Sequence, residues 1–229
     1  MKRTLFSVVF FGTLLFVGNG VVAKAEENSY YIGDEEVQIS ENAVVTTDIE
    51  EVGALLSDSD IEEVIYLDPN LVVEDYVSDI KPENFSPASR AVVNRYRVKN
   101  VKNASDTTDS GAIAAASGGP GVTLAINQTK SVSTTTSAKF GASDKIISAE
   151  VGWSTTGTTS ISISGSYKVP KTSGGKNVKN CKLSAHTIRK RKSFVVDKMA
   201  WNSIKWEKQG TGYVSKAYGV SFKKTFTYK

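Results

Sequence analysis

The sequence is poor in the residues that build disulfides, metal sites and catalytic centres. It contains one cysteine, Cys181, and one histidine, His186. A single cysteine cannot form an internal disulfide framework, and the two residues lack partners for a zinc site or a cysteine–histidine nucleophile. Cys181 alternates with Leu183 and Ala185, which favours a small buried hydrophobe over a reactive thiol. We therefore expect no disulfide, no metal and no cofactor.

Carboxylates that could form a catalytic pair are also scarce in the second part of the chain. Residues 84–229 contain six, scattered singly, and no nucleophile motif surrounds the abundant serines and threonines. We therefore expect no enzyme activity, and a binding function is favoured. The six carboxylates are Asp106, Asp109, Asp144, Glu150, Asp197 and Glu207.

Only one long apolar run is present, at residues 5–22. Met1-Lys2-Arg3 precedes it, and Ala23-Lys24-Ala25 follows it. A charged start, an apolar core and a small-residue site are typical of a secretory signal peptide. We expect residues 1–25 to be removed by cleavage after Ala25, giving a secreted, extracellular protein. A retained anchor helix is the alternative.

Negative charge is nearly absent from one part of the chain and concentrated in the other. Residues 26–83 hold 18 acidic residues and one lysine, whereas residues 84–229 hold 24 basic and six acidic residues. Capping-box patterns at 47–50 and 59–62 predict short helices in the acidic part. Residues 26–90 are therefore interpreted as an acidic, partly helical segment. It is either a propeptide released near Arg90 or a permanent subdomain on an ordinary linker.

Strand-like alternation dominates residues 91–229, the basic domain. Apolar residues occupy even positions from Val122 to Phe140 and odd positions from Ile147 to Val169. Pairing Phe140 with Ile147 brings both sets onto one face, which predicts one long antiparallel hairpin over residues 122–169. Further strands are predicted at 91–102, 178–188 and 218–228, with a flexible loop at 103–121.

Residues 132–170 resemble the inserting-hairpin region of β-pore-forming toxins of the aerolysin and epsilon-toxin type. They also resemble a group of secreted proteins of Gram-positive bacteria that share this core. The likeness is carried by SAEVGWS at 148–154 and SISISGSYKVP at 160–170. It implies an elongated β protein, secreted as a soluble precursor, that forms a homo-oligomer on membranes after proteolysis. The expected inserting residues are Val132, Thr134, Thr136, Ala138, Phe140, Ile147, Ala149, Val151 and Trp153.

A short cationic run with tryptophans beyond it offers a second kind of site. Arg189, Lys190, Arg191 and Lys192, with Trp201 and Trp206, form either a contact for an anionic surface or, for the basic run, a solvated turn. Because we expect the protein to be exported, we do not expect it to bind nucleic acid.

The sequence thus predicts a mainly β fold, an elongated antiparallel domain of aerolysin-like or β-sandwich type. The leading function is a membrane-active, pore-forming protein activated by removal of an acidic propeptide. The alternative is a non-catalytic module that binds anionic cell-surface polymers.

Overall fold

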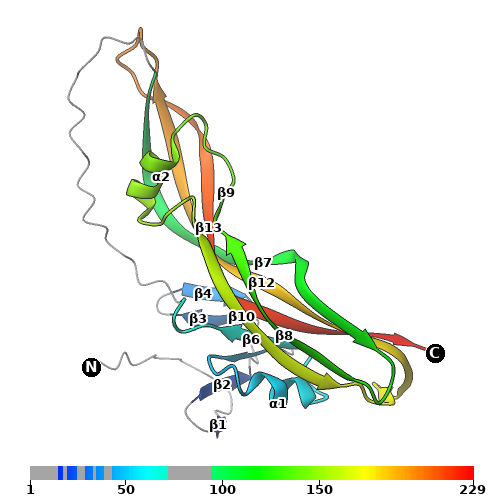
Figure 1. Cartoon of the computed structure of the whole chain (residues 1–229). Helices are drawn as coiled ribbons and strands as arrows, with labels where there is room; N and C mark the ends of the chain where they lie inside the picture. Colours follow the sequence, from blue (N-terminus) through cyan, green and yellow to red (C-terminus); the bar gives the residue numbers. More distant parts are fainter. Residues whose placement is uncertain (1–14, 18–19, 25–28, 33–34, 39–42, 72–93) are drawn as a thin grey trace.

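The computed structural model describes residues 15–17, 20–24, 29–32, 35–38, 43–71 and 94–229, and the protein is elongated and mainly β (Figure 1). Three long strands form a spine along its length: β7 (Arg95–Gly118), β12 (Lys176–Met199) and β13 (Glu207–Tyr228). β12 lies between the other two and pairs antiparallel with both. At about 3.3 Å per residue, a strand of this length spans roughly 80 Å. The predicted mainly β, antiparallel fold is confirmed.

The spine strands extend beyond the strands that the sequence predicts. The prediction of a flexible loop at 103–121 is wrong, because β7 continues through this stretch to Gly118. Its small Ser, Thr, Ala and Gly residues carry little strand signal, but the neighbouring β12 supplies backbone partners along its length. Several register shifts in the β7–β12 ladder accommodate the irregular sequence.

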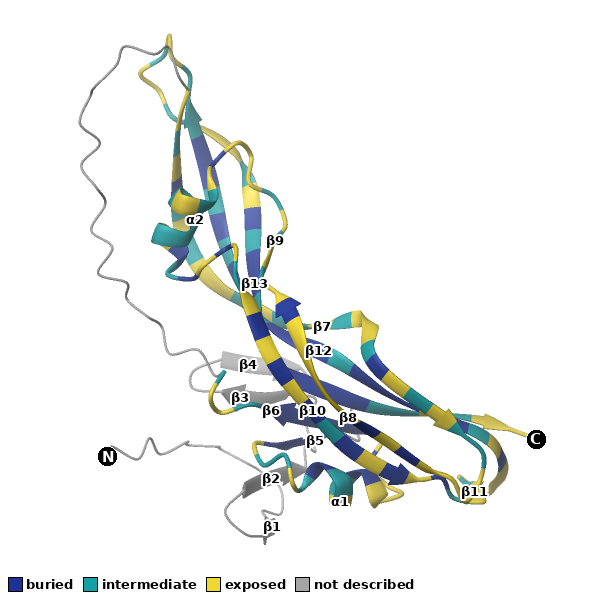
Figure 2. Cartoon of the chain, in the orientation of Figure 1, coloured by how far each residue is buried: buried dark blue, intermediate teal, exposed yellow. Residues whose placement is uncertain are grey.

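A second layer of two strands, β8 (Thr123–Ser133) and β10 (Thr158–Lys168), covers one half of the spine. These strands pair antiparallel, with Leu124 opposite Tyr167 and Ile126 opposite Gly165. The register predicted by pairing Phe140 with Ile147 would place Leu124 opposite Ile163, so it is wrong by four residues. Because the register differs by an even number of residues, the apolar residues of the two strands still share the buried face, as Figure 2 shows along both strands.

The acidic segment contributes β5 (Ala43–Thr46), α1 (Val52–Ser57) and β6 (Glu63–Leu67). β6 extends the spine by pairing antiparallel with β13, and β5 pairs parallel with β6. A predicted helix after Ser59 is wrong, because this stretch leads into β6. All five residues of β6 are buried, an environment that favours a strand inside a sheet.

Five further strands are short: β1 (Leu15–Val17), β2 (Gly20–Lys24), β3 (Ser29–Ile32), β4 (Glu35–Gln38) and β11 (Thr172–Ser173). β1 pairs with β2, β3 with β4, and β2 also pairs with β5. β1 and β2 lie within the predicted signal peptide. Its cleavage site at Ala25 lies outside the described residues, as does Arg90, and both processing events stay predictions.

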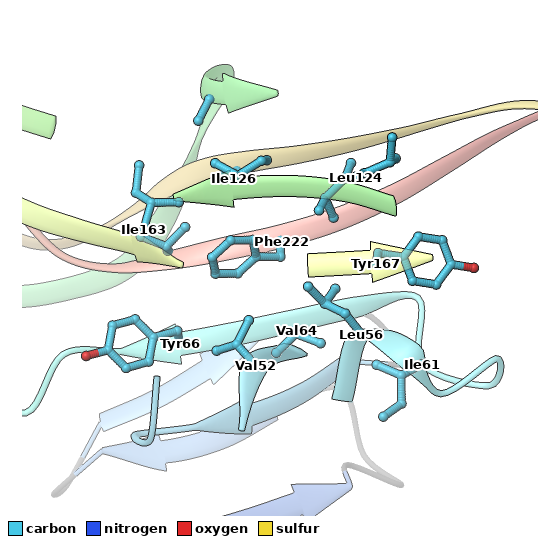
Figure 3. Packing of buried hydrophobic residues seen from close by; sticks show 14 of the residues in the cluster. Val52, Leu56, Ile61, Val64, Tyr66, Leu124, Ile126, Ile163, Tyr167 and Phe222 are labelled. Atoms are coloured by element: carbon cyan, nitrogen blue, oxygen red, sulfur yellow. The ribbon is translucent and has the colours of Figure 1, made fainter. Parts of the chain in front are cut away.

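The largest hydrophobic core joins the acidic segment to the β domain. Val52 and Leu56 of α1 contribute to the same cluster as Ile163 of β10 and Phe222 of β13 (Figure 3). The contact is close, since a β-carbon placed on Gly165 would lie 3.1 Å from the Phe222 ring and 3.2 Å from Leu56. The acidic segment therefore covers apolar surface of β10 and β13 as well as carrying charge.

Candidate functional site

The segment between β8 and β10, residues 134–157, is called the insert here. It leaves the β8–β10 pair and folds against the other half of the spine (Figure 1). The Thr134 amide donates to the Gly157 carbonyl at 2.8 Å, which closes the base of the insert. Beyond it, β9 (Thr135–Thr136) pairs with β13 instead of with the returning arm. The predicted pairing of the two hairpin arms with each other is therefore wrong within the insert.

A short helix, α2 (Asp144–Val151), occupies the part of the insert that was expected to be a strand. The Ser143 hydroxyl caps it by accepting from the Ile146 amide, and Gly152 ends it in the left-handed conformation, with φ of 75°. Ile147 and Val151 are four residues apart, so they share a helix face as well as a strand face. The alternation fits both structures, and the serine cap and glycine stop were the signals for the helix.

The apolar side of the insert is buried against the spine. Ile147, Val151 and Trp153 are at most 4% exposed, and they belong to a second core cluster. The Lys192 ammonium lies 4.7 Å from the centre of the Trp153 ring. Three of the nine residues predicted to enter a membrane are thus covered by the spine in this conformation. The other members of the cluster are Val98, Ala142, Phe194, Val196 and Val214.

The remaining predicted inserting residues lie along the incoming arm and on α2. Val132 is buried in the larger core, whereas Phe140 is 40% exposed and has a positive φ of 48°. The incoming arm passes close to two glycines of β13. A β-carbon on Gly210 would lie 2.2 Å from the Phe140 ring, and one on Gly212 would lie 2.3 Å from a backbone oxygen of the arm. Thr134, Thr136, Ala138 and Ala149 are half-buried.

A polar network joins α2 to the segments of the insert before and after it. Thr155 donates to an Asp144 carboxylate oxygen at 2.8 Å, and its hydroxyl lies 3.0 Å from that of Ser148. Lys139 forms an ion pair with the other Asp144 oxygen at 2.6 Å. The hydrogen bonds from Lys139 and Thr155 hold the pKa of Asp144 below its usual range. The network fixes α2 through one ionised carboxylate.

The cationic run lies within β12, so the interpretation of a solvated turn is wrong. Arg189 and Lys192 are 9% and 8% exposed, which does not support their predicted contact with an outside polymer. Arg189 instead pairs with Asp109 at 2.8 Å and donates to the Ser133 carbonyl, where β8 meets the insert. Lys190 and Arg191 are half-buried, and Arg191 lies over the Tyr213 ring.

The two predicted surface tryptophans lie near the far end of the spine, in the β12–β13 connection. Trp201 is 66% exposed, whereas Trp206 is half-buried beneath the guanidinium of Arg97, 4.5 Å from its ring centre. Ile204, between them, is 92% exposed and was not singled out from the sequence. A lone isoleucine between serine and lysine gives no sequence signal of surface exposure, which becomes evident only once the turn around it is known.

Comparisons with models of protein families, with curated proteins and with solved structures found no match to this chain. Within the part of the chain that the structure describes, no three or more His, Cys, Asp or Glu side chains are grouped to hold a metal ion. No helix among the described residues is long and apolar enough to cross a membrane.

Proposed function

We propose that this is a secreted, membrane-active protein of the aerolysin-like, β-pore-forming type. In the proposed mechanism, the insert leaves the spine and extends the β8–β10 pair into a longer hairpin. The pairing register between β8 and β10 is the observation that carries this proposal.

That register continues one position into the insert. Thr134 already pairs with Gly157, the next position after β8 and β10 end. Continuing it would place Ala138 opposite Trp153 and Phe140 opposite Val151. The two arms, 134–144 and 147–157, would each supply about 11 residues, and a membrane-spanning strand needs about 9 to 11.

The faces of the extended hairpin would suit a lipid on one side and water on the other. The apolar residues of both arms would share the first face with threonines and, near the turn, Asp144, whereas only polar, charged or glycine residues would share the second. The first face would hold Val132, Thr134, Thr136, Ala138, Phe140, Ala142, Asp144, Ile147, Ala149, Val151, Trp153 and Thr155. The second would hold Ser133, Thr135, Ser137, Lys139, Ser148, Glu150, Gly152, Ser154 and Thr156.

The acidic segment fits the part of a removable cover in this mechanism. Its Leu56 and Val64 pack on the apolar side of the β8–β10 pair and of β13. Removing residues 26–90 would uncover this apolar surface and leave a strongly basic domain, which would favour contact with an anionic membrane.

The alternative, a binding module for anionic polymers, rests on the net positive charge of residues 84–229. It needs no movement of the insert, and its binding should weaken as salt screens the charges. It draws less support from the cationic run, because Arg189 and Lys192 are buried and paired inside the protein.

A disulfide between the insert and the spine tests the proposal. Thr135 and Ser215 lie opposite each other in the β9–β13 pair, a spacing that a disulfide can bridge. We expect the oxidised Thr135→Cys/Ser215→Cys protein, cleaved within residues 72–93 and freed of the acidic fragment, to release dye from anionic liposomes at least tenfold more slowly than wild type treated in the same way. Reduction should restore the release.

The single Thr135→Cys variant is the matched control and should release dye like the wild type. Unchanged release by the oxidised double variant would contradict movement of the insert. No release by the cleaved wild type, together with salt-sensitive binding to an anionic polymer, would favour the alternative function.

A further inference from the structure

The β12–β13 connection, residues 200–206, is called the tip here. It forms one extreme of the elongated molecule, and Figure 2 shows exposed residues along it. Trp201 and Ile204 expose 66% and 92% of their surface at this point. They are the two most exposed large hydrophobic side chains of the described residues. Isolated apolar residues on a surface are ordinary, but two at the end of a protruding hairpin form a small apolar point.

The tip is a formed turn with local hydrogen bonds. The Ser203 amide donates to the Ala200 carbonyl at 3.0 Å, and the Lys205 amide donates to the Ser203 hydroxyl at 3.0 Å. Trp206 is fixed at its base beneath Arg97, which also donates to Asp197 at 2.8 Å. Trp201 and Ile204 are thus presented on an ordered support, which lowers the entropy lost when they bind.

Positive charge surrounds this apolar point. The strand ends that carry the tip, residues 94–99 and 197–208, hold six basic and two acidic side chains. One of the two carboxylates, Asp197, is buried between Lys99 at 2.7 Å and Arg97. These cations hold the pKa of Asp197 below its usual range, so it is ionised and neutralised by its neighbours. Lys205 and Lys208 remain exposed.

We infer that the tip is an interfacial anchor, which places Trp201 and Ile204 among the headgroups of an anionic lipid bilayer. Tryptophan is favoured at the boundary between headgroups and acyl chains, and lysines beside it attract anionic lipid. The apolar point is too small for a stable protein interface, whereas a bilayer accepts a narrow wedge with a cationic rim.

The position of the tip also fits the insert, and in this respect the inference rests on the proposed function. Phe140 of the insert contacts Gly210 of β13, four residues beyond the end of the tip at Trp206, which is roughly 13 Å in an extended strand. β8 runs toward this half of the molecule, so an extended hairpin would grow toward the tip (Figure 1). Docking by the tip would bring the insert close to the bilayer before it moves.

The test measures vesicle binding by flotation, separately from dye release. Full-length protein is mixed with phosphatidylcholine vesicles that contain or lack 30% phosphatidylglycerol. We expect Trp201→Ser/Ile204→Ser to lower the partition coefficient on the anionic vesicles at least tenfold. Lys205→Gln/Lys208→Gln should lower it about fivefold for each lysine on anionic vesicles alone. Val122→Ser, which removes an apolar side chain that is 48% exposed outside the tip, is the matched control.

Bromine-labelled lipids provide a direct readout of contact. They should quench tryptophan fluorescence of the wild type and of Val122→Ser, but quench Trp201→Ser much less. Equal vesicle binding by Trp201→Ser/Ile204→Ser and the wild type would overturn the inference. Binding to cells without binding to any lipid vesicle would also overturn it, in favour of a protein receptor.

The two hypotheses fail differently. Binding through the tip without dye release after removal of the acidic fragment would support the anchor and contradict pore formation. If the wild type releases dye, and the tip variants bind vesicles and release dye equally well, the result would support pore formation and contradict the anchor.

Discussion

At the scale of single residues, Gly212 of β13 lets the insert pack closely against the spine because it has no side chain. A β-carbon on Gly212 would meet the Ala138 carbonyl oxygen at 2.3 Å and the Phe194 ring at 2.6 Å. The first of these contacts is with backbone, so a side-chain rotation cannot relieve it. Glycine at this position therefore allows the insert to lie flat on the spine.

Gly212→Ala should loosen the insert. Overpacking of this kind costs about 1–3 kcal/mol, and displacing the incoming arm of the insert is one way to relieve it. We expect faster trypsin cleavage after the exposed Lys139 and Lys145, measured by mass spectrometry, at least fivefold above the wild type. Gly111→Ala is the matched control, because a β-carbon there would meet nothing within 4 Å. Equal cleavage of the two variants would contradict this role of Gly212.

At the scale of elements, α2 is held by an ionised carboxylate, which makes its packing sensitive to acid. The pKa of folded Asp144 lies below the usual value of about 3.9. A lowered carboxyl pKa stabilises the folded form above the unfolded value, and this contribution is lost as the pH falls through the folded pKa. The packing of α2 should therefore be unaffected by Asp144 between pH 5 and 7 and weaken below about pH 4.

Hydrogen exchange of residues 144–151, corrected for intrinsic rates, can check this. We expect protection to fall between pH 4 and pH 2.5 in the wild type, and Asp144→Asn to lose much of it already at pH 6. Glu150→Gln, an exposed carboxylate change on the same helix, serves as the comparison. If Asp144→Asn lost protection at low pH in the same way as the wild type, the acid sensitivity of α2 would have to come from other titratable groups.

The elements also show how far the sequence could predict this fold. Alternation placed Leu124, Ile126, Ile161 and Ile163 on the buried face correctly, because strand periodicity depends on neighbouring residues alone. The register and the ends of the strands were missed, since both depend on partner strands far away in the sequence. Residue periodicity also could not distinguish α2 from a strand, because Ile147 and Val151 satisfy both patterns.

The candidate site was predicted less well than the fold. Residue type identified Trp201 as a surface contact, and the structure leaves it exposed. The same reasoning failed for Arg189, because a cation and its partner Asp109 lie 80 residues apart and meet only in the folded sheet. Ile204 has no distinguishing neighbour in the sequence, and its exposure follows only from its place in the turn.

At the scale of the whole molecule, cutting the chain between the acidic segment and the β domain should not separate them at once. β6 pairs with β13, and Leu56 lies fully buried in the shared core. Lys224 also donates to the Leu56 carbonyl at 3.0 Å and the Asp58 carbonyl at 2.7 Å, at the end of α1. The acidic fragment should therefore remain bound as a noncovalent partner.

We expect protein cleaved within residues 72–93 to elute as one species on size exclusion and to release little dye until the fragment dissociates. Leu56→Ala should hasten dissociation, because removing a buried leucine costs about 2–5 kcal/mol. Leu55→Ala, at a half-buried neighbouring position, should have a smaller effect. Immediate loss of the fragment from cleaved wild type would show that strand pairing and core contacts do not retain it.

The pairing of β6 with β13 also bears on how the chain reaches its folded state. The Glu63 carboxylate accepts from the Ser221 hydroxyl, although 158 residues separate them. β6 is synthesised long before its partner and cannot complete its edge of the sheet until β13 has formed. Long-range pairing of this kind slows folding, since the entropy of closing a large loop is lost before the contacts form. For the secretion that we propose, slow folding would keep the chain unfolded long enough to be threaded through an export channel.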